Sequence, residues 1–293
     1  MIKKLKTFLI GTVELSDPAF RMLKKISNLD LVITQKKNTY NSDHMDFKKK
    51  NIKVLEVENI NSKLVENYIK KGKFELGFCV GWGQIIKKNI FQIPRYGIIG
   101  HHPTMLPYNK GKHPLTWAIF LNLKYTGSTF FQITNKIDGG SIYNQKKIKI
   151  HKGGDVRDLY NKVKKILPIQ IKEIINLISN DRNFKKKLIL NKTKNYWRKR
   201  DDFDSKIDFR MSYFIIERLV KALNKPYVGA HIIVNGKKIQ IFKVKKGKSG
   251  KIFENLEPGK IIKISNNFVL VKCYDTVVKI YVNNFPHNIK YLK

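Results

Sequence analysis

The sequence predicts an α/β protein with a doubly wound, mostly parallel, Rossmann-like sheet, followed by a small C-terminal β-barrel-like domain. Two observations predict this fold class. In the first half of the chain, short apolar runs alternate with helical patterns, which is typical of a parallel sheet. Near the end, five short strands follow a single helix, which is typical of a small barrel. We place the domains at residues 1–205 and 206–293.

The first half of the chain alternates strands with helices. An apolar run opens the sheet, and the Gly11-Thr12 turn that follows it lacks the later glycines of a dinucleotide-binding motif. We therefore do not expect a nicotinamide cofactor. The expected strands are Thr7–Ile10, Leu29–Thr34, Leu76–Val80 and Tyr96–Gly100, and the expected helices are Pro18–Ile26, Asn61–Lys71 and Gln84–Phe91.

The second half begins with helices and ends with strands. Leu115–Leu123 predicts a helix that opens after Pro114, and Asp155–Ser179 predicts a long amphipathic helix interrupted at Pro168. The Asn235-Gly236 pair is typical of a two-residue hairpin turn. A helix over Ile216–Leu223 precedes the expected strands Ala230–Val234, Lys238–Val244, Gly259–Ile264, Phe268–Lys272 and Val277–Val282.

Length and composition favour a globular intracellular protein. The 293 residues suffice for two domains, and a hydrophobic content of 42% supports a buried core. The N-terminal apolar run is too short for a signal peptide and is interrupted by Glu14, and no segment approaches a membrane span. Cys79 and Cys273 lie far apart in the sequence, which favours two reduced thiols in the cytoplasm.

The net charge of +37 raises the question of nucleic-acid binding. Only eight of the 59 basic residues are Arg, whereas proteins that bind phosphates and bases rely on the Arg side chain. Abundant Lys, Asn and Ile are typical of an AT-rich genome. The composition therefore disfavours a nucleic-acid partner without excluding it, and the positive field should attract an anionic substrate such as a nucleotide diphosphate.

One stretch carries candidate chemistry. The apolar run Gly97–Gly100 ends in His101 and His102 and is followed by a proline turn and the basic loop Asn109–Pro114. Further along, Asp138 stands before a Gly-Gly turn. A His and an Asp from neighbouring strand ends can pair, and the Asp then orients the imidazole and stabilises its charged form.

This pattern resembles the folate-dependent formyltransferases, which carry Asn-x-His-x-Ser-Leu-Leu-Pro, a basic Gly loop before a Pro, and an Asp-x-Gly turn. The resemblance extends from about residue 5 to about residue 235. Thr126–Phe131 and Ser141–Gln145 are similar to the family's strands before and after the Asp. One position departs from the family, because Gly100 stands where most members have Asn.

The resemblance implies that a formyl group is transferred from N10-formyltetrahydrofolate to an amine, with no metal. His102 would handle the amine proton or donate to the oxyanion, and Asp138 would hold its ring. Asp138 alone would also be explained as a turn cap. Because Gly100 has no amide to offer, His102 itself, a water, His113 or Thr104 would meet the oxyanion, unless activity is lost.

Two loops are the expected binding elements. Val80, Gly81, Trp82 and Gly83 resemble the family loop whose backbone faces the pterin, and Ile133 to Asp138, including Ile137, would form the opposite wall. The alternatives are a tight strand-to-helix turn at the glycines and a cap on the sheet at Trp82.

The acceptor would contact a second set of residues. The loop from Tyr108 to His113 would hold phosphates or hydroxyls of the acceptor, unless its charges only face solvent. The expected acceptor ligands are Thr104, Lys110, Lys112 and Asp43.

The acceptor amine is the open question. Methionyl-tRNA formyltransferases usually have Arg-Gly-Ala-Ala-Pro, or a close variant, where this chain has Lys110-Gly111-Lys112-His113-Pro114. The latter looks more like the enzymes that formylate nucleotide-linked amino-deoxy sugars for lipopolysaccharide or other surface glycans. We therefore favour a nucleoside-diphosphate amino sugar as the acceptor. The sequence is compatible with a homodimer. The alternatives are methionyl-tRNA as acceptor, or a degenerate formyltransferase fold that binds nucleic acid.

Overall fold

A computed structural model describes residues 4–36, 43–180, 195–248 and 250–292. The chain divides into two compact units. Unit 1 comprises Met1–Pro114, Tyr125–Lys149 and Tyr160–Arg198, and unit 2 comprises Leu115–Lys124, Ile150–Leu159 and Lys199–Lys293. Two pieces from the middle of the chain thus belong to unit 2, and the boundary at residue 205 stays a prediction.

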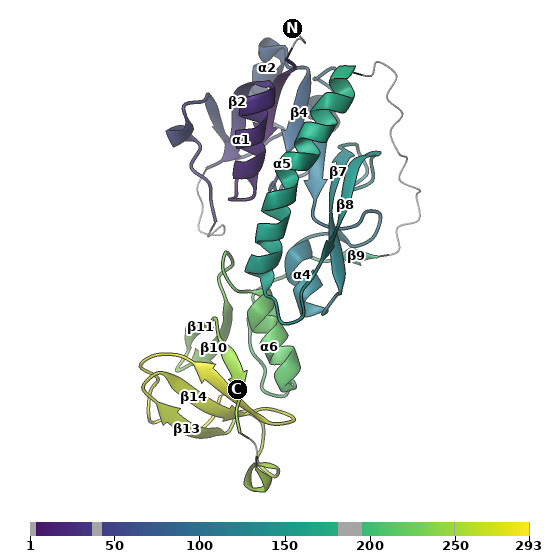
Figure 1. Cartoon of the computed structure of the whole chain (residues 1–293). Coiled ribbons are helices and arrows are strands. Elements are labelled where there is room, and N and C mark those ends of the chain that lie inside the picture. The colour runs from purple at the N-terminus through teal and green to yellow at the C-terminus, as the bar shows by residue number, and fades with distance from the viewer. Residues whose placement is uncertain (1–3, 37–42, 181–194, 249, 293) are drawn as a thin grey trace. The chain divides into compact units, whose positions relative to one another are not determined.

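Unit 1 is built on a seven-stranded sheet in the order β3-β2-β1-β4-β5-β7-β8 (Figure 1). The first five strands in this order are parallel, and β7 and β8 run antiparallel to their neighbours. The α/β, mostly parallel fold class is therefore confirmed. The strands are β1 Lys6–Ile10, β2 Asn28–Gln35, β3 Val54–Val57, β4 Leu76–Cys79, β5 Ile98–His102, β7 Tyr125–Gln132 and β8 Ile142–Lys149.

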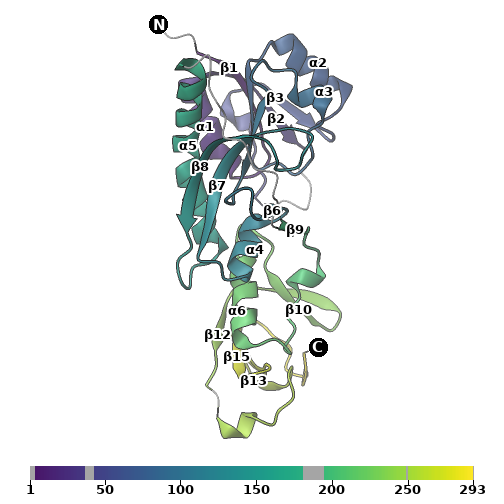
Figure 2. The ribbon, with the colours of Figure 1, turned by 90° about the vertical axis from the view of Figure 1, so that its right-hand side faces the viewer.

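Helices cover both faces of this sheet. Figure 2 shows α1 and α5 on one side of the strands and α2 and α3 on the other. On the α2 side, the fully buried Val65, Ile69 and Ile90 pack against apolar side chains of β1, β2, β4 and β5. These helices are α1 Ser16–Ile26, α2 Lys63–Gly72, α3 Lys88–Phe91 and α5 Val156–Asn180, with a 3-10 turn η1 at Lys48–Lys50. Helix α4, Pro114–Phe120, belongs to unit 2 from Leu115 on.

Two helix predictions differ from the structure. The helix expected over Gln84–Phe91 is reduced to α3, because the residues before it bond to another loop: Ile60 N–H donates to Gln84 Oε1 at 3.0 Å and Lys87 N–H donates to the Asn61 side chain at 2.7 Å. The interruption expected at Pro168 does not occur, since α5 runs through it. Fully buried apolar residues on either side of Pro168 keep the helix on the sheet.

Two strand predictions also differ. The edge strand β3 was not expected, because four residues give too short an apolar pattern. Strand β5 lies two residues later than expected, so His101 and His102 are inside the strand and not beyond it.

Unit 2 contains a small antiparallel β domain, as predicted, but the strand expected over Lys238–Val244 is divided into β11 and β12, which belong to different sheets. Its six strands form a two-stranded sheet, β10-β11, and a four-stranded sheet, β12-β15-β14-β13, around one apolar core with α6. Asn235 and Gly236 have φ values of 49° and 74°, which fits the expected hairpin turn. The elements are α6 Tyr213–Ala222, β10 Ala230–Val234, β11 Lys237–Ile241, β12 Val244–Lys246, β13 Ile261–Ser265, β14 Phe268–Lys272 and β15 Val277–Tyr281, with 3-10 turns η2 Phe203–Ser205 and η3 Lys251–Phe253.

Both cysteines, Cys79 and Cys273, are buried free thiols. Within the described parts of the chain, no helix combines the length and the apolar character that crossing a membrane requires.

Candidate active site

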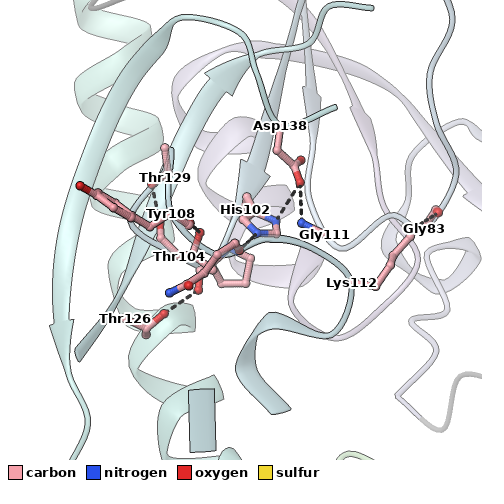
Figure 3. Close-up of polar contacts among 11 residues, drawn as sticks. Gly83, His102, Thr104, Tyr108, Gly111, Lys112, Thr126, Thr129 and Asp138 are labelled. Atoms are coloured by element: carbon pink, nitrogen blue, oxygen red, sulfur yellow. Dashed lines mark hydrogen bonds and ion pairs between the residues drawn. The ribbon is translucent and has the colours of Figure 1, made fainter. Parts of the chain in front are cut away.

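His102 is the centre of the candidate site. It is the last residue of β5, opposite Thr129 of β7, and its side chain is only 8% exposed. Its Nε2 lies 2.9 Å from the backbone carbonyl of Asn109, and its Nδ1 lies 3.8 Å from Asp138 Oδ2 (Figure 3). A carbonyl oxygen only accepts, so Nε2 carries a hydrogen and donates it.

Asp138 reaches His102 by a different route from the one expected. Strand β7 runs antiparallel to β5, so the carboxyl end of β7 lies beside Ile99 and not beside His102. Ile133 N–H continues this pairing by bonding to the Ile98 carbonyl at 2.9 Å, and the loop then turns back, since Asp138 lies beside His102 and Gly111. Burial, together with the nearby Asp138 carboxylate, raises the pKa of the Cys79 thiol to about 12, which agrees with Asp138 lying at the end of β4. The pair therefore comes from a strand end and a returning loop.

A short loop between the two groups contacts both of them. While Asn109 accepts from His102, the N–H of Gly111 donates to Asp138 Oδ2 at 3.1 Å (Figure 3). The loop residues Lys110–Gly111 form β6, which pairs in parallel with β9, Tyr196–Trp197. The backbone that touches His102 and Asp138 is therefore held by a segment from much later in the chain.

This arrangement suits a ring that donates hydrogen bonds. In the protonated ring both nitrogens donate, and both have an acceptor, the Asn109 carbonyl and the Asp138 carboxylate. At 3.8 Å the contact of Nδ1 with Asp138 is too long for a hydrogen bond, and it is an ion pair only when the ring is protonated. For Nε2 to take a proton from a substrate amine, the contact with Asn109 has to open.

Gly100 and His101 precede His102 in β5, and neither provides the side-chain amide that the family's Asn would supply. A Cβ on Gly100 would lie 3.0 Å from Ile133 Cγ1 and 3.1 Å from Phe131 Cζ, so side chains cover the place where the family has Asn. His101 points away from His102: its Nε2 lies 2.8 Å from Ser128 Oγ and its ring centroid 5.0 Å from that of Phe130. Burial, with the neighbouring His102, lowers the pKa of His101 to about 3. His101 therefore stays neutral and cannot replace the missing Asn.

The expected folate loop is partly closed by the protein itself. Val80 is fully buried, and the Gly81 carbonyl accepts from Thr12 N–H at 3.3 Å. A Cβ on Gly81 would lie 2.6 Å from Val13, whereas one on Gly83 would meet nothing within 4 Å. The close approach at Gly81 is therefore made by the turn after β1, and the open side of the loop is at Gly83.

The residues expected to hold the pterin offer apolar side chains and one hydrogen-bond donor without a recorded partner in the described part of the chain. Trp82 and Ile133 are both partly buried and pack against the same apolar cluster of unit 1, and Ile137 is 47% exposed. The indole Nε1 of Trp82 is buried without a hydrogen-bond partner among the residues that the structure describes. A pterin offers acceptor atoms and an apolar face, so these residues fit the expected folate.

The expected acceptor ligands fall into two groups. Lys110 and Lys112 lie on the loop beside His102; Lys110 is buried, and Lys112 Nζ donates to the Gly83 carbonyl at 2.6 Å (Figure 3). Thr104 is also buried, and its hydroxyl donates to the Tyr108 carbonyl at 3.0 Å. Lys112 thus connects the acceptor loop with the folate loop.

Asp43 and His113 have other surroundings. Asp43 accepts from the Tyr160 hydroxyl at 2.7 Å, and the same hydroxyl accepts from Leu15 N–H at 2.9 Å, which ties the loop after β2 to α5. His113 has a φ of 54° and directly precedes α4. The roles of all these residues toward an acceptor stay predictions.

Sequence reasoning missed two residues that shape the site. Asn109 has a φ of 58° and presents its carbonyl to His102, and Asn195 pairs with Asn109. The Asn-Lys-Gly sequence after Pro107 is typical of a tight loop and could have drawn attention to Asn109. Nothing in the sequence around Asn195 points to the site.

Within the described ranges, no group of three or more His, Cys, Asp or Glu side chains is placed to hold a metal ion. The site therefore combines a buried His, an Asp, a loop of backbone donors and acceptors, and an adjoining apolar surface. These are the parts that an acyl-type transfer to an amine requires.

Comparison with known protein families agrees with this class of site. Residues 19–194 match the formyl transferase family, and residues 201–290 match the formyl transferase C-terminal domain. The chain therefore belongs to the formyl transferase family, and it is a folate-dependent formyltransferase.

Two curated relatives illustrate the range of sequence similarity. The bifunctional polymyxin resistance protein ArnA of Wigglesworthia glossinidia brevipalpis is 32% identical over 80% of this chain, which spans 36% of ArnA's length. A methionyl-tRNA formyltransferase of Natranaerobius thermophilus is 26% identical over 92% of this chain and 88% of its own.

Two solved structures share the fold at low sequence identity. HypX from Aquifex aeolicus in complex with tetrahydrofolic acid has a TM-score of 0.67 at 15% identity, over 94% of this chain and 43% of HypX. An N-formyltransferase from Helicobacter canadensis, in complex with folinic acid and dTDP-3-aminofucose, has a TM-score of 0.66 at 19% identity, over 95% of this chain and 99% of its own.

Proposed function

We propose that this protein transfers a formyl group from N10-formyltetrahydrofolate to the amine of a nucleoside-diphosphate-linked amino-deoxy sugar, in the synthesis of a surface glycan such as lipopolysaccharide. The observation that carries the proposal is the loop Lys110–His113, which lies against His102 and Asp138 and is basic. An anionic acceptor held by this loop would have its amine beside His102.

In this proposal the residues divide the chemistry between them. The amine attacks the formyl carbon, the bond from that carbon to the folate nitrogen breaks, and the proton lost by the amine is passed to the folate nitrogen as it leaves. His102 donates to the developing oxyanion or moves that proton, and Asp138, 3.8 Å away, stabilises the charged ring. Trp82, Ile133 and the open side of Gly83 would hold the pterin.

The distribution of charge supports a small anionic acceptor over tRNA. Residues 199–293 contain 20 Lys and Arg against 8 Asp and Glu, a net charge of +12, and residues 1–198 carry the remaining +25 of the total of +37. Both parts thus have nearly the same net charge per residue. A protein that binds a polyanion through one surface would be expected to concentrate its basic residues there. The even spread instead fits a general enrichment in Lys.

Two further observations bear on the acceptor. The N-formyltransferase from Helicobacter canadensis, whose structure contains dTDP-3-aminofucose, shares the fold over 99% of its own length. Methionyl-tRNA formyltransferase is the second candidate function, because the Natranaerobius thermophilus enzyme matches over 92% of this chain with a higher identity. We propose a cytoplasmic location for either reaction, where the two buried thiols would stay reduced.

A panel of acceptors tests the proposal. Purified protein is incubated with N10-formyltetrahydrofolate and, separately, with dTDP-, UDP- and GDP-linked amino sugars and with initiator methionyl-tRNA, and formylated products are detected by mass spectrometry. We expect turnover with at least one amino-sugar nucleotide. Turnover with methionyl-tRNA alone would support the second function. Tight RNA binding that weakens steeply with salt, without turnover of any acceptor, would support a degenerate fold that binds nucleic acid.

A further inference from the structure

The position of His102 depends on a residue that lies outside the motif. The ring donates from Nε2 to the Asn109 carbonyl, and that carbonyl is aimed by a backbone with a φ of 58°, in the left-handed region. A backbone in this region is less stable than in the usual regions, even for Asn, and needs support from its surroundings.

Asn195 gives this support through two hydrogen bonds. Its Oδ1 accepts from the Asn109 N–H at 2.9 Å, and its Nδ2 donates to Asn109 Oδ1 at 2.7 Å. Backbone and side chain of Asn109 are therefore fixed by one amide, which leaves the Asn109 carbonyl on the side of His102. We call this pair of bonds the Asn195 clasp.

The residues after Asn195 extend the same contact. Tyr196 and Trp197 pair in parallel with Lys110 and Gly111, and Lys112 N–H donates to the Trp197 carbonyl at 3.0 Å. The Asn195 clasp and these backbone contacts thus hold the loop from Asn109, which contacts His102, to Gly111, which contacts Asp138.

We infer that Asn195 is a positioning residue for formyl transfer, acting on His102 through the Asn109 carbonyl. The inference rests on the role of His102 in the proposed function. Without the Asn195 clasp, Asn109 can turn its carbonyl away, and the His102 ring loses the acceptor that fixes its Nε2. Folate binding should change little, because no hydrogen bond that the structure records joins Asn195 to the expected folate loop. Acceptor binding can also weaken, because the pairing that begins at Asn195 includes Lys110.

The first test reads the ring directly and needs no acceptor. In protein labelled with ¹⁵N-histidine, we expect a His102 Nε2–H signal that exchanges slowly with water, assigned by its absence in His102→Gln. Asn195→Ala should lose this slow exchange. Asn224→Ala is the matched control, since Asn224 also makes two side-chain hydrogen bonds, with Asp155 and with Lys225 N–H. A slowly exchanging signal that survives in Asn195→Ala would overturn the inference.

The second test uses turnover with the acceptor that the panel identifies. Asn195→Ala should lower kcat by about tenfold to hundredfold, the size of effect that a misplaced catalytic group produces, with a nearly unchanged Michaelis constant for N10-formyltetrahydrofolate. Asn195→Asp keeps the acceptor for the Asn109 N–H and should recover part of the loss. In a His102→Ala background, Asn195→Ala should cause no further loss, because a residue that acts through His102 has nothing left to position.

The experiments distinguish a failure of the role proposed for His102 from a failure of the role inferred for Asn195. Near-normal turnover of His102→Ala would overturn the role of His102 in the proposed function. A His102→Ala enzyme that is inactive, together with an Asn195→Ala enzyme that is as fast as the parent, would leave that role intact and overturn the positioning by Asn195. A fall in melting temperature equal to that of Asn224→Ala, with unchanged kcat, would likewise reduce Asn195 to a structural residue.

Discussion

A substitution at Gly111 tests whether β9 holds the loop beside His102 in place. Its φ is 103°, and a Cβ there would lie 2.2 Å from the Trp197 carbonyl oxygen. In Gly111→Ala the loop and β9 must therefore move apart. This movement should break the hydrogen bonds from Lys112 N–H to the Trp197 carbonyl and from Gly111 N–H to Asp138. Gly153 provides the control, because it has a φ of 81° and nothing within 4 Å of its Cβ position.

The expected magnitudes follow from these two environments. The unfavourable φ alone costs about 1–2 kcal/mol in either variant. Two lost hydrogen bonds add about 1 kcal/mol each in Gly111→Ala. Gly111→Ala should thus destabilise its unit by about 3–4 kcal/mol, against about 1–2 kcal/mol for Gly153→Ala. Its kcat should also fall by about a hundredfold, as expected for displaced catalytic groups.

Urea unfolding followed by circular dichroism and steady-state kinetics measure the two effects. Gly111 belongs to unit 1 and Gly153 to unit 2, so each variant is compared with the parent protein, and its loss of stability is read against the parent's own transition. If Gly111→Ala and Gly153→Ala had equal stability and both kept the parent kcat, β9 would not hold the loop, and the account of the site's geometry would be refuted.

Three further changes probe neighbouring parts of the site. His102→Ala should lower kcat by about 10²–10⁴-fold with little change in the Michaelis constants, measured by steady-state kinetics; near-normal kcat contradicts its role. Gly100→Asn should not improve catalysis but should weaken folate binding, because its Cβ would press on Ile133; tighter binding in calorimetry would be evidence against this wall. Burial holds the pKa of His101 at about 3, below its ordinary 6.5. Below about pH 6.5 the unfolded chain therefore binds a proton at this residue that the folded protein does not, and the free energy of unfolding falls by at most about 1.4 kcal/mol per pH unit. His101→Gln should flatten that part of the stability–pH curve, and an unchanged slope would argue against it.

Sequence patterns predicted the parts of the fold that local physics determines. Alternating apolar runs and helical periods gave most strands and helices of both units, and Asn235-Gly236 gave its hairpin, because each depends on neighbouring residues. The interruption expected at Pro168 failed because burial of an entire helix face outweighs one missing backbone hydrogen bond. Tertiary packing determines whether a helix continues through a proline, and this packing cannot be inferred from a local sequence pattern.

The site was predictable in its residues but not in its construction. His102 and Asp138 were found from their motif, yet the reversal of β7, which makes Asp138 return on a loop, has no local signal. Asn195 lies 86 residues from Asn109, so its contact is a property of the folded chain alone. The cover that Ile133 places on Gly100 likewise appears only once the loop has folded back.

The central claim is that this site formylates a nucleotide-linked amino sugar. The most direct measurement is one competition reaction in which a limiting amount of N10-formyltetrahydrofolate, labelled in its formyl group, is offered to the amino-sugar nucleotides and initiator methionyl-tRNA together. We expect the label to appear in a sugar nucleotide, and we expect a His102→Ala protein to transfer almost none of it. Label found in methionyl-tRNA and in no sugar nucleotide would contradict the claim.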